Sequence, residues 1–183
     1  YTGTFISHPR GFGFVQVEEM EGARDIFIPE EGIGTAFHGD KVQVVVTKEE
    51  KDSKRCEGTI AKVLERGMGE IVGTYEKSSG FGFVVPDNQR FLRDIFIPQG
   101  KSMNAENRDK VLVKIQDFGS RNKSPEGKIV EILGKPGEKG LDVLCVAKSH
   151  DLPMEFPEKV LNQAERIKET LNEGDFYQRL DLR

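Results

Sequence analysis

The sequence predicts a mainly β protein: two tandem five-stranded antiparallel barrels, followed by a short strand-plus-helix segment. The first observation is a repeat, because "GFGFV" occurs at 11–15 and 80–84 and "DIFIP" at 25–29 and 94–98, both shifted by 69 residues. The second is that short runs of alternating apolar and polar residues, separated by turn residues, fill each copy. The third is a change to a helical pattern near the end of the chain. A repeat of this length indicates whole small domains, not turns of a solenoid.

Each element follows from the local pattern. Strands are predicted near 2–7, 11–17, 24–28, 41–47 and 57–64 in the first copy, with equivalents in the second. The division that results is a first barrel domain over 1–68, a second over 69–137 and a final segment over 138–183.

The final segment lacks the repeat. "LDVLCVA" at 141–147 is predicted as a strand, and residues 156–174 as a helix. Pro157 suits the first turn of that helix, and Gly174 suits the residue just past its end. One helical face carries Val160, Ala164, Ile167 and Leu171, which we expect to form a packing seam.

Composition excludes several classes of protein. No run approaches the roughly 20 apolar residues of a membrane span. The two cysteines, Cys56 and Cys145, lie far apart, so free thiols in a reducing compartment are expected. His8, His38 and His150 are scattered without metal-ligand spacing, so no metal is expected in this chain. The net charge is −4, and the middle third, 71–140, is the only basic part.

The phenylalanines of the repeated words are predicted to face solvent. Strand alternation in 11–18 places Phe12 and Phe14 on the face of Gln16 and Glu18, opposite the valines. In "DIFIP" the two isoleucines share one face and Phe27 takes the other. The second copy repeats the pattern with Phe81, Phe83 and Phe96. Exposed aromatic rings beside glycines are suited to stacking unpaired bases, so single-stranded nucleic acid is the predicted ligand.

Basic residues near these rings are predicted to hold phosphates. In the first copy they are Arg10, Arg24 and Lys41. In the second they are Lys77, Arg93, Lys110, Lys114, Arg121 and Lys123, the last two within the loop 118–125. The positive charge of the second copy predicts that it contributes more of the affinity.

"RGFGFV" followed by "DIFIPE" resembles the cold-shock domain, an OB barrel that binds single-stranded nucleic acid. The family's next His and Phe are here Pro29 and Glu30, then Pro98 and Gln99, which implies a smaller aromatic surface. Ser79 stands where the family has a basic residue before the second word. Two tandem copies, with "HDLPMEFPEKVLNQAE" and "RLDLR" after them, resemble the N-terminal RNA-binding part of the ribonuclease II family, of the ribonuclease R type.

That resemblance implies a parent enzyme, a processive exoribonuclease that uses Mg²⁺ and degrades RNA from its 3′ end to nucleoside 5′-monophosphates. This chain is expected to be its substrate-loading part, without catalytic residues; Asp181 belongs to the lead-in and is not expected to bind metal. The expected partners are single-stranded RNA and the enzyme's own C-terminal catalytic domain. A cytoplasmic monomer with no membrane association is predicted.

Two alternatives remain open at this stage. One is a stand-alone tandem cold-shock protein that acts as an RNA chaperone or translation regulator. The other is a protein-interaction module whose phenylalanine faces are partner patches.

Overall fold

The computed structural model describes residues 1–18, 25–49, 56–120 and 123–167 of the 183-residue chain. By its internal contacts the chain divides into two units, Tyr1–His150 and Asp151–Arg183. Among the described residues, the first unit contains both barrels, with ten strands and two short helices.

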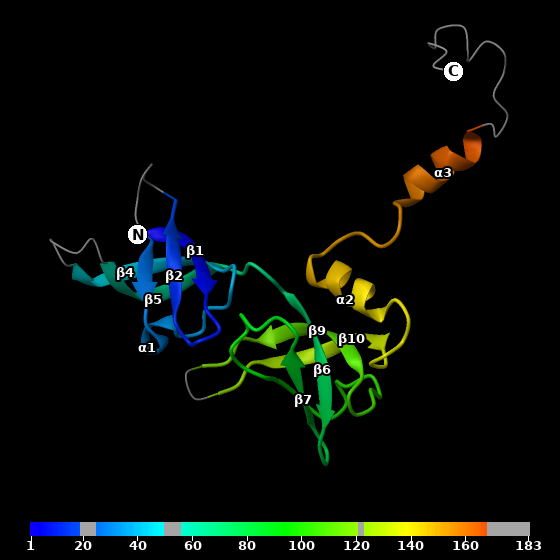
Figure 1. Cartoon of the computed structure of the whole chain (residues 1–183), viewed down its shortest axis with the longest axis horizontal. Coiled ribbons are helices and arrows are strands. Elements are labelled where there is room, and N and C mark those ends of the chain that lie inside the picture. The colour runs from blue at the N-terminus through cyan, green and yellow to red at the C-terminus, as the bar shows by residue number, and fades with distance from the viewer. Residues whose placement is uncertain (19–24, 50–55, 121–122, 168–183) are drawn as a thin grey trace, which may run out of the picture. The chain divides into compact units, whose positions relative to one another are not determined.

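The first barrel (blue to cyan in Figure 1) closes in the strand order β1-β2-β3-β5-β4. Its neighbouring strands are antiparallel except at the closing bridge, where Phe27 of β3 meets Glu57 of β5 in parallel. Its strands are β1 (Thr2–Ser7), β2 (Gly13–Val17), β3 (Ile26–Ile28), β4 (Lys41–Glu49) and β5 (Cys56–Glu65). A short helix, α1 (Glu30–Ile33), lies between β3 and β4.

The second barrel repeats this arrangement with the order β10-β8-β7-β6-β9 and the same parallel closure, at Phe96 and Glu126. Its strands are β6 (Glu70–Lys77), β7 (Gly82–Pro86), β8 (Ile95–Ile97), β9 (Lys110–Asp117) and β10 (Glu126–Gly134). The prediction of two five-stranded barrels is therefore confirmed, and every strand predicted in the first copy is present within a few residues.

Each core is filled mainly by aliphatic side chains, on the strand faces opposite the repeated phenylalanines. In the first barrel the fully buried side chains include Phe5, Val15, Ile28 and Val42. In the second barrel they include Val84, Ile95, Ile97, Val111 and Ile129. Because these residues suffice to fill a small barrel, the repeated phenylalanines remain outside it.

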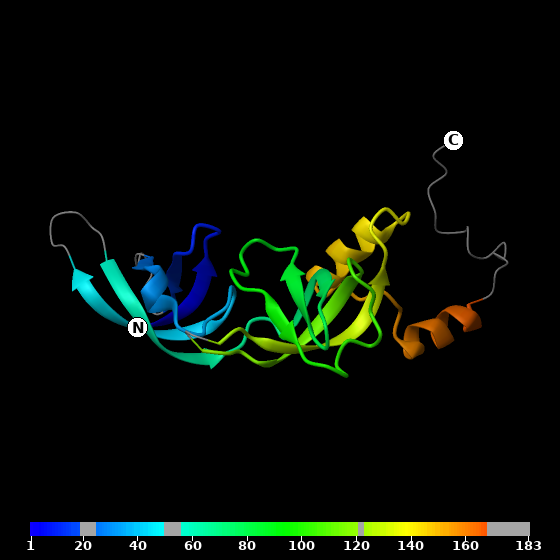
Figure 2. The ribbon, with the colours of Figure 1, turned by 90° about the horizontal axis from the view of Figure 1, so that it is seen from below.

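The strand predicted at 141–147 is wrong, since this segment forms helix α2 (Leu141–Ser149). Leu141, Leu144 and Cys145 follow the three- and four-residue spacing of one helical face, a pattern that a short apolar run hides. Both barrels are already closed, so no strand edge remains for it to pair with. Instead α2 contacts β6 and β10 on the outside of the second barrel (Figure 2, yellow).

The second unit contains α3 (Glu158–Arg166), which begins two residues later than predicted, with Pro157 as its N-cap and not within its first turn. The described structure of this helix ends at Ile167, so Leu171 and the predicted end at Gly174 lie outside the described residues. None of the α3 residues is buried, so the packing seam remains a prediction. No helix in the described ranges is long and apolar enough to cross a membrane.

Candidate nucleic-acid interface

The second glycine of each "GFGFV" word lets a core ring pack against the strand. A side chain at Gly13 would overlap the ring of Phe5, and one at Gly82 would overlap the ring of Tyr75. Phe5 and Tyr75 are both buried in their barrels. Because the core ring fills the space beneath the glycine, the phenylalanines on either side of it project outward.

The first glycine of each word shapes the turn before the strand. Gly11 has φ of +89° and Gly80 has φ of +83°, a left-handed conformation that other residues adopt at a cost. The residue after this glycine, Phe12 or Phe81, is therefore the first on the outward face of its barrel. The sequence of the repeated word is therefore explained by one turn, one core ring and two outward-facing rings.

Strand pairing brings the phenylalanines of each copy together. Phe14 on β2 lies directly opposite Phe27 on β3, and Phe83 on β7 lies opposite Phe96 on β8. We call Phe12, Phe14 and Phe27 the first aromatic trio, and Phe81, Phe83 and Phe96 the second aromatic trio.

The two trios have almost the same geometry. Ring centroids in the first trio are 5.6–5.8 Å apart, with interplanar angles of 89°, 43° and 64°. In the second they are also 5.6–5.8 Å apart, with angles of 88°, 41° and 61°. Phe14 is 37% exposed and Phe81 is 39% exposed, while the other four rings are half-buried. The predicted outward orientation is therefore observed for all six.

The surroundings of the trios differ. On the β1 side of Phe14 the outward neighbour is Ile6, whereas the equivalent neighbour of Phe83 on β6 is Glu76. The second trio thus has the Glu76 carboxylate beside it, although the net charge of the second copy is positive. Its greater share of affinity remains a prediction.

Lys41 and Lys110 occupy equivalent positions, and both form ion pairs. Lys41 Nζ lies 2.7 Å from Glu18, and Lys110 Nζ lies 2.6 Å from Asp87 and 2.9 Å from the Thr74 hydroxyl. Both lysines start strands that adjoin β1 or β6, not the strands of the trios. The structure therefore places Lys41 two strands from Phe14 and Lys110 two strands from Phe83, each lysine beside a carboxylate.

Other predicted phosphate contacts are also engaged elsewhere or distant. Arg93 donates to the carbonyls of Ser120 at 2.6 Å and Gly34 at 3.2 Å, and burial lowers its pKa. Lys123 pairs with Asp117 at 2.6 Å, and that contact raises the pKa of Lys123.

Lys77 and Lys114 are exposed but do not share the face of the second trio. Lys77 lies opposite Gly82, on the side of β6 that carries Tyr75. Lys114 lies on β9, whose neighbours β6 and β10 bear no residue of a trio.

Arg10 is the predicted cation closest in sequence to a described trio. It lies in the exposed turn that leads to Phe12, and its side chain forms no ion pair among the described residues. Arg24 and Arg121 lie outside the described residues. Of the predicted basic residues that the structure describes, Arg10 is therefore the best placed for a phosphate next to a ring.

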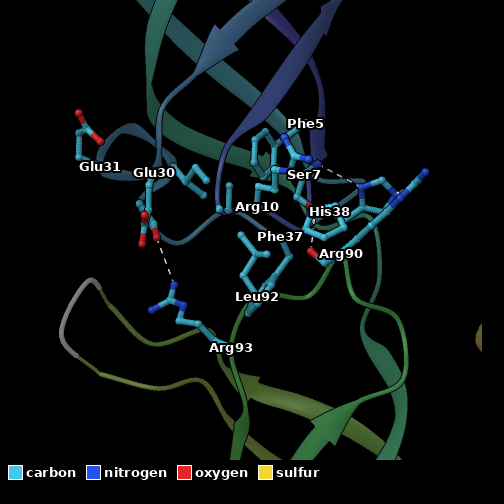
Figure 3. A pocket seen from close by; sticks show the side chains of 15 residues that line it. Phe5, Ser7, Arg10, Glu30, Glu31, Phe37, His38, Arg90, Leu92 and Arg93 are labelled. Carbon is cyan, nitrogen blue, oxygen red and sulfur yellow. Dashed lines mark hydrogen bonds between the residues drawn. The ribbon is translucent and has the colours of Figure 1, made fainter.

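A cleft of about 700 Å³ separates the turn that carries Arg10 from the segment Arg90–Arg93. Figure 3 shows Phe37 and Leu92 in its middle, with His38 and Arg90 on one side and Arg93 on the other. The Ser7 hydroxyl donates to the Arg90 carbonyl at 2.6 Å, and Arg90 Nη1 lies 3.0 Å from His38 Nε2. Burial and the Arg90 charge lower the pKa of His38.

Phe37 fixes the floor of this cleft. It belongs to the turn before β4, yet it is buried in the core cluster of the second barrel. Its ring lies 5.8 Å from Phe91 and 5.5 Å from Phe118, and the Arg66 guanidinium lies 3.6 Å from the Phe118 centroid. Sequence reasoning missed this role because Phe37 lies outside the repeated words.

His8 is a second residue that sequence reasoning missed. Its ring stacks on Phe12 with centroids 4.3 Å apart and planes within 8° of parallel. The sequence does show an aromatic side chain, His8, in the turn just before the first "GFGFV", where the second copy has Ser78.

Comparison with known proteins agrees with this geometry. A ribonuclease B OB domain model matches residues 3–63, and a cold shock domain model matches residues 83–157. Ribonuclease R of Vibrio parahaemolyticus is 35% identical over 99% of this chain, and ribonuclease R of Aquifex aeolicus is 35% identical over all of it. Over its whole length the chain is therefore homologous to part of ribonuclease R. It spans 22% and 25% of the length of these two relatives.

Three solved structures have a similar fold. The apo form of Mycoplasma genitalium RNase R matches with a TM-score of 0.80 at 13% identity, over 92% of this chain and 27% of that one. Its complex with ribose-methylated single-stranded RNA matches with the same TM-score at 14% identity, over the same shares. Yeast Ssd1, a pseudonuclease, matches with a TM-score of 0.70 at 16% identity, over 82% of this chain and 25% of that one.

The Mg²⁺ implied for the family finds no fitting ligands in the described ranges. No group of three or more His, Cys, Asp or Glu side chains there could hold a metal ion.

Proposed function

We propose that the two aromatic trios bind single-stranded RNA and that this chain is the substrate-loading part of a longer ribonuclease R-like enzyme. The observation that carries the proposal is the near-identical geometry of two outward-facing trios on separate closed barrels. Exposed aromatic surface costs free energy in water, so its repetition favours a binding role. Base stacking on aromatic rings contributes about 1–3 kcal/mol per base and tolerates any sequence.

The family relation supports the nuclease context. The chain spans about a quarter of its curated relatives, so we assign hydrolysis to another part of the longer protein. That protein is proposed to degrade RNA processively from the 3′ end, with Mg²⁺, to nucleoside 5′-monophosphates. A cytoplasmic location, a monomeric state and contact with the enzyme's own catalytic domain belong to the same proposal.

Of the two expected domain boundaries, 68/69 is retained in this proposal, whereas the second domain is proposed to extend past 137 and to include α2. The cold shock domain match continues to residue 157, and α2 packs on the second barrel. Both observations favour attaching α2 to the second domain.

The test is a fluorescence-anisotropy titration of the full 183-residue chain with labelled single-stranded RNA at two salt concentrations. One variant replaces the second trio (Phe81→Ala, Phe83→Ala, Phe96→Ala) and another the first (Phe12→Ala, Phe14→Ala, Phe27→Ala). A matched control, Val143→Ala with Val146→Ala, removes exposed apolar surface from α2, where those residues are 72% and 59% exposed.

Each trio variant is expected to bind at least about fivefold more weakly, since even one lost base stack is worth about 1–3 kcal/mol. The control is expected to bind like the unmodified chain. The logarithm of the association constant is also expected to fall linearly with the logarithm of salt concentration, because phosphate contacts release counterions. Equal affinity of both trio variants and the unmodified chain, with circular dichroism showing folded protein, would exclude the proposed role and favour a protein-interaction surface.

A further inference from the structure

His8 makes the two aromatic trios unequal. Its imidazole lies on Phe12 with centroids 4.3 Å apart and an 8° angle between the planes. A nucleobase stacked on a phenylalanine adopts the same face-to-face arrangement. His8 therefore fills, from within the chain, the position that a base would take on Phe12.

The turn holds the imidazole in place. The His8 N–H donates to the Phe12 carbonyl at 2.7 Å, and the Gly11 N–H donates to the His8 carbonyl at 3.0 Å. The Arg10 N–H donates to His8 Nδ1 at 3.2 Å. The backbone and one ring nitrogen thus both position the side chain over Phe12.

The second barrel has the same turn without the ring. The Ser78 N–H donates to the Phe81 carbonyl at 2.9 Å, which matches the bond between His8 and Phe12. The turn is one residue shorter, and a serine side chain offers no ring to stack. Accordingly Phe81 is exposed, at 39%, whereas Phe12 is half-buried.

We infer that His8 is an internal competitor for a base on Phe12, so that the first trio binds RNA only when the imidazole leaves the ring, while the second trio is open. This inference rests on the proposed RNA-binding function and adds an order to it: the second trio accepts a base at Phe81 without displacing anything. An aromatic pair of this kind corresponds to a roughly 2- to 12-fold factor in affinity.

The test exchanges the two residues. His8→Ser reproduces the second turn, and its hydroxyl is able to accept the Arg10 N–H in place of Nδ1. Ser78→His places an imidazole at the equivalent point of the second turn. His8→Ser is measured in the full chain whose second trio is replaced by alanines, and Ser78→His in the chain whose first trio is replaced, so that each reports on one barrel.

The probe is a labelled single-stranded RNA of about 16 nucleotides, the upper end of the site size of an OB barrel. His8→Ser is expected to tighten binding roughly 2- to 12-fold, and Ser78→His to weaken it by a similar factor. Weaker or unchanged binding by His8→Ser would overturn the inference, because it would make His8 a stacking residue in its own right or a bystander. Failure of the RNA-binding proposal itself is separate, since both trio backgrounds would then bind like the unmodified chain.

A second readout follows the ring directly. The chain has three histidines, so their ring protons are resolvable by NMR. The Phe12 ring current is expected to shift the His8 protons upfield in the free protein, and saturating RNA is expected to remove that shift. The exposed His150 serves as the reference. A His8 signal that keeps its upfield shift at saturation would contradict displacement.

Discussion

Replacing Asp40 with Asn tests how the turn before β4 is held to the segment that follows β5. The Asp40 side chain is fully buried. Its carboxylate accepts the Phe37 N–H at 2.9 Å, the Gly67 N–H at 2.9 Å and an Arg66 N–H at 2.6 Å. One buried carboxylate therefore positions Phe37, which enters the core of the second barrel.

The expected loss follows from the burial of the pair. Removing one partner of a buried ion pair costs about 3–5 kcal/mol, because the other charge stays desolvated. The Arg66 side chain is 28% exposed and also donates to the Thr35 carbonyl, so the lower end applies. We expect Asp40→Asn to reduce the free energy of unfolding by about 3 kcal/mol.

The repeat supplies a matched control. Asp109 occupies the equivalent position in the second barrel and is 5% exposed, but it accepts the Glu106 N–H at 2.8 Å and forms no ion pair within the described ranges. Asp109→Asn weakens one charge-assisted hydrogen bond, at about 1 kcal/mol. Urea unfolding followed by circular dichroism gives both values, and a double-mutant cycle with Arg66→Met isolates the ion pair. Losses that agree within 1 kcal/mol between Asp40→Asn and Asp109→Asn would refute this reasoning.

Three further outcomes are expected. Gly82→Ala would press a methyl group into the Tyr75 ring and lower stability by about 1–3 kcal/mol. Gly69→Ala, with open space around the added methyl group, would be neutral or slightly stabilising. Thermal unfolding compares the two variants, and equal melting points would contradict close packing at Gly82. Because the pKa of His38 is lowered in the folded chain, the unfolded chain takes up a proton near pH 6.5, where folded His38 is still neutral. The contribution of His38 to stability is therefore complete above pH 6.5 and is lost as the pH falls towards the folded pKa. His38→Gln should remove this loss, and a pH profile of urea midpoints that is unchanged in the variant would contradict the prediction. Arg10→Gln should reduce the salt slope of RNA binding by about 0.7, and an unaltered slope would remove Arg10 from the phosphate contacts.

The repeated words were sufficient to predict the barrels and the outward rings. Strand alternation separates Phe14 from Val15 without further information, and the identical spacing makes the second copy a repetition of the first. The prediction holds because both glycines and the aliphatic face favour the same conformation.

The ion pairs and the His8 stack could not be predicted, because they depend on contacts that the sequence does not specify. The charges of Lys110 and Asp87, or of Lys123 and Asp117, are visible in the sequence, but their pairing depends on which strands meet. The stack of His8 on Phe12 depends on a turn only a few residues long, and no rule of strand alternation covers it.

The segment 141–147 failed for a different reason. A run of seven mostly apolar residues fits a buried strand and one face of a helix equally well. The closed barrel decides between them, because it leaves an outer surface for α2 and no edge for another strand.

The central claim is that bases stack on the two trios, and photocrosslinking tests it most directly. The full chain would be bound to single-stranded RNA that contains 4-thiouridine, irradiated, digested and mapped by mass spectrometry. We expect crosslinks within the "GFGFV" and "DIFIP" peptides of both barrels, with Phe81 the most reactive because no ring of the chain stacks face-to-face on it. Crosslinks confined to α2, to the outer wall at Lys114 and Lys128, or to the cleft beside Arg90 would contradict it.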